Sequence, residues 1–427
     1  MEQIKLPTGE RIWQERLANG LMVMILPRPG FLRTYGILST HYGSLDSRFK
    51  TPSKGIVDVP PGIAHFLEHK LFEEEEGNVF DRFAKWGASV NAFTSYSQTS
   101  YIFSTTENWQ DCLTTLIEFV NSPHLTAENV EKEKGIIEQE LRMYEDHPNH
   151  RIHTLLLESL YQENPVRLDI GGTVDSVYRI TVEDLMTCYD TFYQPSNMAL
   201  SVVGNVDHQE TLDLIKRSYP SWPREQTAIE RIFPKEPREI VQSRVEEKLS
   251  ISRPRYLLGF KHDPMWQGEE LIRQQIAMSI ALKLIAGRSS NVYERLYEAD
   301  LVSDSFGASF SAHPQYAHSV IGSETSDPDA LHEELTKIIN GLKQGGVDVN
   351  DVERLKRQIY GQYLASLDSF EYTANRLISH YFNDTSWHTY LESLQAVTAN
   401  EVQQAISQHL DWDRSSVSIL LPVEPHD

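Results

Sequence analysis

The residues of this chain with the clearest potential for chemistry are two histidines and a glutamate within five positions: His65, Glu68 and His69. In an α-helix, positions i, i+3 and i+4 lie on one face, so the three side chains point the same way. Two imidazoles one turn apart can bind a single zinc ion, and a carboxylate between them can reach water at that ion without being a ligand. The apolar residues of this stretch fall largely on the other side, which predicts an amphipathic helix packed on a core. They are Ile63, Phe66, Leu67 and Leu71.

The pattern is short, and its chance occurrence has to be considered. With 16 histidines and 61 acidic residues among 427, it would arise somewhere by chance with a probability of roughly 0.08. On these five residues alone, the alternative is an ordinary surface helix that carries two histidines. A hydrolytic zinc ion takes three protein ligands and keeps a fourth position for water, so the zinc hypothesis requires another ligand from elsewhere in the chain.

A second helix, expected over 126–144, carries the candidates for that ligand. Thr126 is a suitable N-cap, and apolar residues recur after it at helical spacing. Glu133 and Glu140 are two turns apart and share one face, about 10 Å apart along the axis. Only one of them can bind a metal on the first helix directly, and the other would orient a ligand from behind. The alternative is a solvated charged face, since the alternating Glu and Lys at 131–134 are typical of exposed helices.

At this point the residues resemble a known family. The order His65-x-x-Glu68-His69-x-x-Phe72, followed by Glu140 at 71 residues (140 − 69) after the second histidine, is similar to the pitrilysin/insulysin and mitochondrial-processing-peptidase family. Its members are zinc proteases in which the metal motif is inverted. The resemblance covers essentially the whole chain.

The resemblance implies a role for each residue. His65, His69 and Glu140 would bind one zinc ion per chain, and Glu133 would be an auxiliary acid. Glu68 would be the general base, which takes a proton from water and delivers it to the leaving amine. The chain would then be a zinc-dependent endopeptidase that hydrolyses peptides or unfolded segments inside a closed chamber. The alternative function is a non-catalytic peptide-binding or scaffold subunit that retains zinc.

A further match is the segment 87–94, Gly-Ala-Ser-Val-Asn-Ala-Phe-Thr. It resembles the family's Gly-x-x-x-Asn-Ala-x-Thr strand, whose exposed edge pairs with the substrate backbone. By this match Asn91, Ala92 and Thr94 would bind an extended peptide through its main chain. An asparagine that ends a strand is also common in turns, so Asn91 has that alternative.

The chain also contains an internal repeat, because 126–140 aligns with 348–362 at an offset of 222 (348 − 126). Together with the resemblance, the repeat predicts an α/β (α+β) fold of two homologous domains. Each would be a mixed, mostly antiparallel sheet with helices packed on it, and the two would form half of a clamshell. We expect a zinc-binding domain at 1–225, a linker at 226–250 and a metal-free copy at 251–427.

The repeat predicts where chemistry is absent. Leu355 and Gln362 stand where Glu133 and Glu140 stand in the first half, and the counterpart of the zinc helix, near 280–286, has no histidine. The second domain is therefore expected to be a structural copy without metal.

The resemblance also bears on partners. In the family, four such domains close one chamber, and the facing domain supplies an Arg and a Tyr that polarise the scissile carbonyl. Asp300 and Asp304 occupy those places here, and a carboxylate cannot donate a hydrogen bond unless it is protonated. We therefore expect a heterodimer with a related metal-free subunit that supplies the Arg and Tyr. The alternatives are a shifted alignment, in which another donor such as Tyr293, Arg295 or Tyr297 reaches in, and a weakened enzyme. The alternative partner is a second copy of this chain in a homodimer.

Composition bounds these expectations. A hydrophobic fraction of 40% is typical of a globular protein. The net charge of −22 argues against nucleic acid or an anionic membrane as a partner. No run of 18 apolar residues is present, and the first residues resemble neither a signal nor a transit peptide. Two cysteines are too few for a disulfide framework, so we expect a cytoplasmic protein. The partners that the resemblance implies are peptide substrates.

Overall fold

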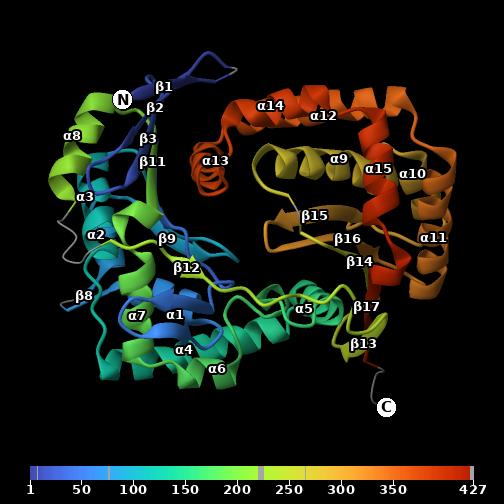
Figure 1. Ribbon diagram of the computed structural model, residues 1–427, viewed down its shortest axis with the longest axis horizontal. Coiled ribbons are helices and arrows are strands. Elements are labelled where there is room, and N and C mark those ends of the chain that lie inside the picture. Colours follow the sequence, from blue (N-terminus) through green and yellow to red (C-terminus); the bar gives the residue numbers. More distant parts are fainter. Residues whose placement is uncertain (7, 76, 220–225, 265, 424–427) are drawn as a thin grey trace. The chain divides into compact units, whose positions relative to one another are not determined.

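The computed structural model describes residues 1–6, 8–75, 77–219, 226–264 and 266–423 (Figure 1). It contains two compact units, and each is assembled from three separate stretches of chain. Unit 1 consists of Met1–Leu141, Asp169–Phe233 and Tyr363–Trp387, and unit 2 consists of Arg142–Leu168, Pro234–Gln362 and His388–Asp427.

Unit 1 is built on a seven-stranded sheet of order β1-β2-β3-β11-β4-β10-β9. Strand β11 is parallel to β3, and all other neighbours are antiparallel. The central strands β4 and β11 are buried along their whole length. Strand β11 is largely apolar, as a strand covered on both faces should be, whereas β4 also buries the polar side chains of Thr34, Ser39 and Thr40. The strands are β1 (Glu2–Lys5), β2 (Arg11–Arg16), β3 (Met22–Pro27), β4 (Thr34–Thr40), β9 (Ser89–Thr94), β10 (Thr99–Thr105) and β11 (Met198–Gly204).

Helices pack on both faces of this sheet. Leu38 of β4 lies in the main core with α1, α3, α7 and α8, whereas Tyr35 of the same strand points to the other face. There the Tyr35 hydroxyl accepts a hydrogen bond from Asn375 of α13 at 3.4 Å. The helices of this unit are α1 (Ile63–Lys70), α2 (Val79–Lys85), α3 (Trp109–Val120), most of α4 (Ala127–Glu145), α6 (Val174–Arg179), α7 (Val182–Phe192), α8 (His208–Ser218) and α13 (Phe370–Phe382). Two small sheets complete it: β12 (Glu230–Arg231) with β5 (Arg48–Thr51) and β6 (Gly55–Asp58), and β7 (Glu73–Glu74) with β8 (Gly77–Asn78).

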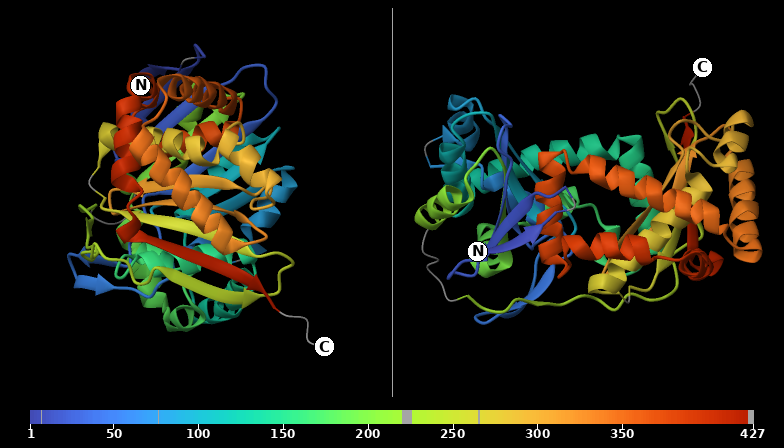
Figure 2. Two further views of the ribbon diagram at one scale, coloured as in Figure 1. Left: turned by 90° about the vertical axis from the view of Figure 1, so that its right-hand side faces the viewer. Right: turned by 90° about the horizontal axis from the view of Figure 1, so that it is seen from above.

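Unit 2 is built on a five-stranded sheet of order β13-β17-β14-β16-β15. The left view of Figure 2 shows β17, in red, running beside yellow strands of this sheet. The strands are β13 (Arg244–Leu249), β14 (Arg255–His262), β15 (Gly307–His313), β16 (Tyr316–Glu324) and β17 (Ser415–Pro422). The helices are α5 (Pro148–Leu160), α9 (Gly268–Ala286), α10 (Asn291–Glu298), α11 (Pro328–Gly345), most of α12 (Val349–Ser366), α14 (Trp387–Ala396) and α15 (Ala399–His409).

The internal repeat is confirmed by the order and direction of the strands. In unit 2, β13 is parallel to β17, and the following pairs are antiparallel. The series β3-β11-β4-β10-β9 of unit 1 has the same order of one parallel and three antiparallel pairs. The predicted fold class, two homologous α/β domains with mixed sheets, is therefore confirmed.

The two units exchange one helix each, which the contiguous ranges 1–225 and 251–427 did not anticipate. Helix α5 follows α4 in the first half of the chain but packs on β14 and β17 of unit 2. A Cβ atom placed on Gly259 of β14 would lie 2.8 Å from a methyl group of Leu160, so α5 lies against this sheet very closely. Helix α13 follows α12 in the second half but covers β4 and β11 of unit 1.

The range 226–250, expected as a linker, contains ordered strands at both ends. Strand β12 pairs with β5 in unit 1, and β13 pairs with β17 in unit 2. Strand β13 is an edge strand whose residues alternate between exposed and half-buried, so its sequence lacks the apolar run that marks a central strand.

Among the described residues, no helix has the length and apolar character needed to cross a membrane.

Candidate metal centre

Helix α1, which carries both histidines of the motif, begins at a junction that requires glycine. Its N-cap, Gly62, has a φ of 91°, in the left-handed region that side chains disfavour. A Cβ atom on Gly62 would lie 2.2 Å from the carbonyl oxygen of Gly171, so any other residue would force the backbone to move. Just after this junction, Phe66 and Leu67 are completely buried in the core of unit 1. This burial fixes the opposite side of the helix, where the histidines lie.

The imidazoles of His65 and His69 meet the carboxylate of Glu140 on α4. Nε2 of His65 lies 3.7 Å from Oε1 of Glu140, and Nε2 of His69 lies 3.4 Å from Oε2. Four tetrahedral zinc bonds of about 2.0–2.2 Å place neighbouring ligand atoms about 3.4 Å apart. Two imidazoles and one carboxylate at this spacing therefore fit one zinc ion. In the described part of the chain, this is the one group of metal-binding side chains whose donor atoms converge within 4.8 Å.

Glu133, the other candidate on α4, lies behind His69. Its Oε1 is 3.0 Å from Nδ1 of His69, within hydrogen-bond distance. When Nδ1 donates to this carboxylate, Nε2 is left as the free donor atom on the side of Glu140, as in carboxylate–histidine–zinc arrangements. Burial opposes ionisation of Glu133, but the hydrogen bond and the charges of His69 and Lys70 outweigh it and lower its pKa.

Lys70 is a participant that sequence analysis did not identify. Its side chain is fully buried, with Nζ 3.9 Å from Oε2 of Glu133. It also hydrogen-bonds to the carboxylate of Glu73 and to the carbonyl oxygen of Asn129, the latter at 3.3 Å. The available signal was a lysine between the second histidine and the apolar pair Leu-Phe, where a buried helix face is expected to be apolar.

The two histidines differ in their affinity for protons. Burial lowers the pKa of His65 to about 4, and the neighbouring His69 adds to this effect. Burial also opposes charge on His69, but the hydrogen bond with Glu133 and the charges of Glu133, Glu140 and Glu68 raise its pKa overall. Nδ1 of His65 is buried and makes no hydrogen bond to any described residue.

Glu68 lies beside the donors and outside their cluster. It is only 8% exposed, and burial raises its pKa despite a hydrogen bond from Thr94. The Thr94 hydroxyl donates to Oε2 of Glu68 at 2.6 Å. A carboxylate with a raised pKa next to a metal-binding cluster is suited to accept and return a proton. Thr94, expected to contact a peptide main chain, thus directs its side chain to the expected base.

The other two residues expected to bind a peptide lie on the outer strand of the sheet. Strand β9 ends the seven-stranded sheet and has β10 as its neighbour on one side. The exposed side chain of Asn91 accepts a hydrogen bond from the amide of Ala92 at 2.9 Å. The structure therefore places Asn91 and Ala92 together on the edge strand of unit 1, the unit that also contains the metal cluster.

The equivalent positions of unit 2 carry no metal chemistry. Leu355 is buried in the apolar core of that unit, and Gln362 is exposed on the same helix, α12. Glu133 is also buried in unit 1. The position is therefore buried in both copies, and it is filled by an apolar residue where no histidine needs an acceptor.

Asp300 and Asp304, which the family resemblance aligns with the expected Arg and Tyr, both have partners within unit 2. Asp300 pairs with Arg253 at 2.6 Å and has a φ of 56°. The carboxylate of Asp304 accepts a hydrogen bond from the Tyr293 hydroxyl at 3.2 Å, and its carbonyl oxygen accepts one from Arg288 at 2.8 Å. Of the alternative donors considered from sequence, Tyr293 thus contacts Asp304 directly.

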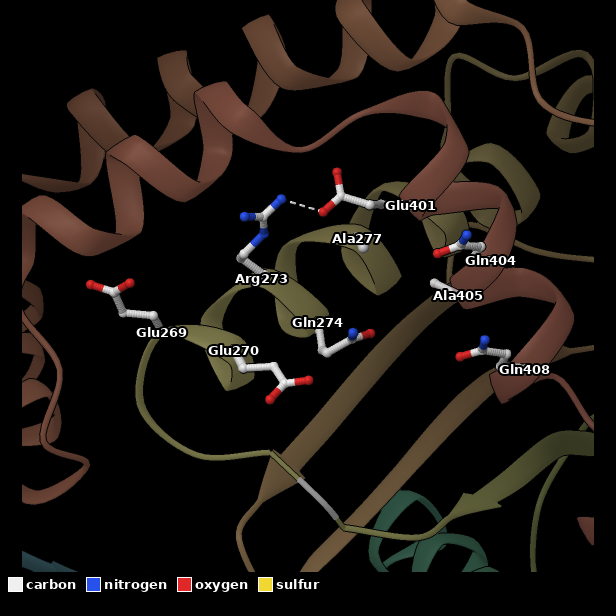
Figure 3. Close-up of a pocket in the computed structure, with 9 residues that line it drawn as sticks. All are labelled: Glu269, Glu270, Arg273, Gln274, Ala277, Glu401, Gln404, Ala405 and Gln408. Carbon is white, nitrogen blue, oxygen red and sulfur yellow. Dashed lines mark hydrogen bonds and ion pairs between the residues drawn. The ribbon is translucent and has the colours of Figure 1, made fainter.

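A separate pocket of about 460 Å³ lies in unit 2, lined by α9 and α15 (Figure 3). Arg273 and Glu401 form an ion pair within it, and the remaining lining is mostly carboxylates and amides. Its carboxylates join no histidine or cysteine in a metal-type cluster among the described residues, so we assign it no part in metal binding.

The fold and the three-donor cluster together define a class of protein: two repeated α/β units, the first of which carries a candidate metal site. Comparison with known proteins agrees with this class. The family model "Insulinase (Peptidase family M16)" matches residues 58–174, and "Peptidase M16 inactive domain" matches residues 179–359. The chain belongs to the M16 family of peptidases, which confirms the resemblance found in its sequence.

Individual relatives support the assignment. The "Uncharacterized zinc protease YmfH" of Bacillus subtilis is 40% identical over 97% of this chain and 97% of that protein. The "Zinc protease PqqE" of Helicobacter pylori is 25% identical over 86% of this chain and 82% of that protein. The crystal structure of a putative M16-like peptidase from Alicyclobacillus acidocaldarius superimposes with a TM-score of 0.95 at 38% identity, covering 98% of this chain and 100% of that one.

Proposed function

We propose that this chain is a zinc-dependent endopeptidase that hydrolyses peptides or unfolded protein segments. The observation that carries the proposal is the buried carboxylate of Glu68 beside the donors His65, His69 and Glu140. A structural zinc site is normally closed by a fourth protein ligand and has no use for a base. Three donors with a neighbouring base fit a hydrolytic site better.

The residues divide the work as follows. Zinc held by the three donors would supply the Lewis acidity that activates water and polarises a peptide carbonyl. Glu68 takes the proton from the attacking water and later delivers it to the leaving amine. Glu133 keeps His69 in one ring orientation. An extended substrate pairs its main chain with the outer edge of β9, which gives affinity with little demand on sequence.

The test is cleavage of an unstructured basic peptide by the zinc-loaded chain beside its Glu68→Gln variant. We expect the variant to retain one zinc ion per chain and to lose cleavage by roughly 10²–10⁴-fold, the usual contribution of a general base. Glu131→Gln, at an exposed position of α4, is the matched control and should cleave normally. Equal cleavage by Glu68→Gln and the unaltered chain would refute the proposal.

We further propose that the working enzyme is a heterodimer with a related, metal-free subunit. The support is that the family resemblance aligns Asp300 and Asp304 with the required hydrogen-bond donors, and both carboxylates are engaged by Arg253 and Tyr293. The chain alone should then bind zinc and cleave poorly, and a related subunit bearing the missing Arg and Tyr should restore cleavage. Full activity of a homodimer would overturn this point and would favour a donor from this chain, such as Tyr293.

The same two aspartates support a second candidate function, a peptide-binding or scaffold subunit that keeps zinc without turnover. It predicts peptide binding by the zinc-loaded chain with no cleavage, even after a related subunit is added.

A cytoplasmic location is also a proposal, consistent with two free cysteines, both buried.

A further inference from the structure

Thr94 connects the outer strand of the sheet with the expected base. It is the last residue of β9, and its hydroxyl donates to Oε2 of Glu68 at 2.6 Å. In the described part of the chain, no other side chain hydrogen-bonds to this carboxylate. The orientation of Glu68 therefore depends on a single donor.

The direction of this hydrogen bond follows from the carboxylate, which has no proton when ionised and can only accept. Thr99 lies opposite Thr94 on β10, and its hydroxyl donates to the carbonyl oxygen of Tyr42 at 2.9 Å. The two threonine hydroxyls are 3.4 Å apart. Each hydroxyl has one proton, and that of Thr94 is directed to the nearer acceptor, Oε2 of Glu68 at 2.6 Å.

This arrangement makes the two oxygens of Glu68 unequal. Oε2 is occupied by Thr94, and Oε1 is left to exchange a proton with water or with a leaving amine. A carboxylate held through one oxygen loses less rotational freedom in the reaction than one that must be oriented at each turnover. Thr94 acts on Glu68 and is therefore a positioning residue.

We propose that Thr94 couples occupation of the β9 edge by a peptide to the placement of the base Glu68. The inference rests on the proposed function and specifies its regulation. A peptide that pairs its main chain with β9 orders the end of this strand, and with it the hydroxyl that holds Oε2. A peptide too short to pair with β9 reaches the site while the base is less well placed, so it is cleaved with a lower kcat.

The kinetic test uses Thr94→Val, which keeps the shape and removes the donor, and Thr94→Ser, which keeps the donor. For a long unstructured peptide, we expect Thr94→Val to lower kcat by roughly ten- to a hundredfold, as loss of a hydrogen bond to a charged group does. KM should change less than twofold, and Thr94→Ser should restore most of kcat. For a short peptide the effect of Thr94→Val should be smaller. Thr191→Val, which removes a hydroxyl bonded within α7, is the matched control.

A second measurement does not depend on turnover. In the metal-free chain, difference infrared spectroscopy against Glu68→Gln identifies the carboxylate band of Glu68. We expect this band to shift in Thr94→Val and to stay in place in Thr94→Ser. An unshifted band, or a raised KM with unchanged kcat, would overturn the inference and make Thr94 a substrate contact or a spectator. A normal Thr94→Val enzyme beside an inactive Glu68→Gln would refute this inference alone, whereas an active Glu68→Gln would refute the proposed function itself.

Discussion

Single side chains determine how the metal cluster is held. His69 contacts one carboxylate through each ring nitrogen, Glu133 at Nδ1 and Glu140 at Nε2. His65 has only one such contact among the described residues, at Nε2. The outer carboxylate Glu133 therefore acts on one histidine alone, and its removal should weaken metal binding without destroying the donor set.

We predict that Glu133→Leu lowers zinc affinity by about 10–100-fold, the usual cost of losing an outer partner of a metal-binding histidine. Leucine is the residue that fills the equivalent buried position, Leu355, in unit 2, so the packing should tolerate it. Competition with a chelator measures the affinity. The exposed Glu131→Leu should bind zinc as the unaltered chain does, and a similar loss in both variants would contradict the assignment.

Lys70 should matter for stability. It is buried between the carboxylates of Glu73 and Glu133, and Lys70→Met would leave these negative charges without their cation. Breaking a buried pair in this way typically costs about 3–5 kcal/mol, and the partly exposed Glu73 places the expected loss near the lower value. Urea unfolding of the metal-free chain measures it. Adding Glu73→Gln should recover part of the loss, and an unchanged unfolding midpoint in Lys70→Met would argue against the pairing.

At this scale, the sequence predicted the residues with chemistry and the orienting position of Glu133 behind a ligand, but it missed Lys70 and the contact of Thr94 with Glu68. His65, His69 and Glu140 converge because two of them share a helix turn and the third lies on a periodic second helix. The contact of Thr94 with Glu68 joins residues 26 positions apart through the packing of α1 on β9. Helical and strand periodicity carry no information on such contacts, because they depend on how the two elements pack.

At the scale of elements, helix boundaries were predictable and helix partners were not. The helix expected over 126–144 is α4, Ala127–Glu145. Its successor α5 shows the apolar face of any packed helix, and this face does not reveal which sheet covers it. For this reason, the exchange of α5 and α13 between units could not be predicted from periodicity.

The junction at the start of α1 allows a controlled test of backbone strain against steric clash. Gly62 and Gly30 share a φ of 91°, but a Cβ atom on Gly30 would meet nothing within 4 Å. Gly30→Ala should cost only the strain of a left-handed residue, about 1–2 kcal/mol. Gly62→Ala should cost more and weaken zinc binding, because α1 must move away from Gly171. Thermal unfolding measures the stability of both variants, and chelator competition measures their zinc affinity. Equal losses of stability in Gly62→Ala and Gly30→Ala would show that the clash with Gly171 is relieved at no cost.

Across the whole molecule, burial keeps several histidines neutral. Burial lowers the pKa of His318 and of His380 to about 3 and that of His409 to about 4. The unfolded chain binds protons on these residues near a pKa of about 6.5, so below that pH it holds more protons than the folded chain. Stability therefore rises with pH in this range and is lost as pH falls.

We predict that these histidines make the free energy of unfolding of the metal-free chain independent of pH above about pH 7. It should then decline by about 1.4 kcal/mol per pH unit for each buried histidine between about pH 6 and 4. Urea unfolding across this range gives the change of the unfolding free energy with pH. His318→Gln should reduce this slope by the contribution of one proton, about 1.4 kcal/mol per pH unit. A slope that is unchanged in His318→Gln would show that this residue is protonated in the folded chain.

The exchanged helices also set an order for synthesis on the ribosome. The sheet of unit 1 is complete once β11 has emerged, near residue 204, yet one face stays bare until α13 appears at residues 370–382. More than 160 residues are translated in between (370 − 204). The nascent chain must therefore hold an unfinished domain with exposed apolar strands during that interval. We therefore expect unit 1 to complete its folding only after α13 has been synthesised, and the first half of the chain made alone to lack the helix that covers this face.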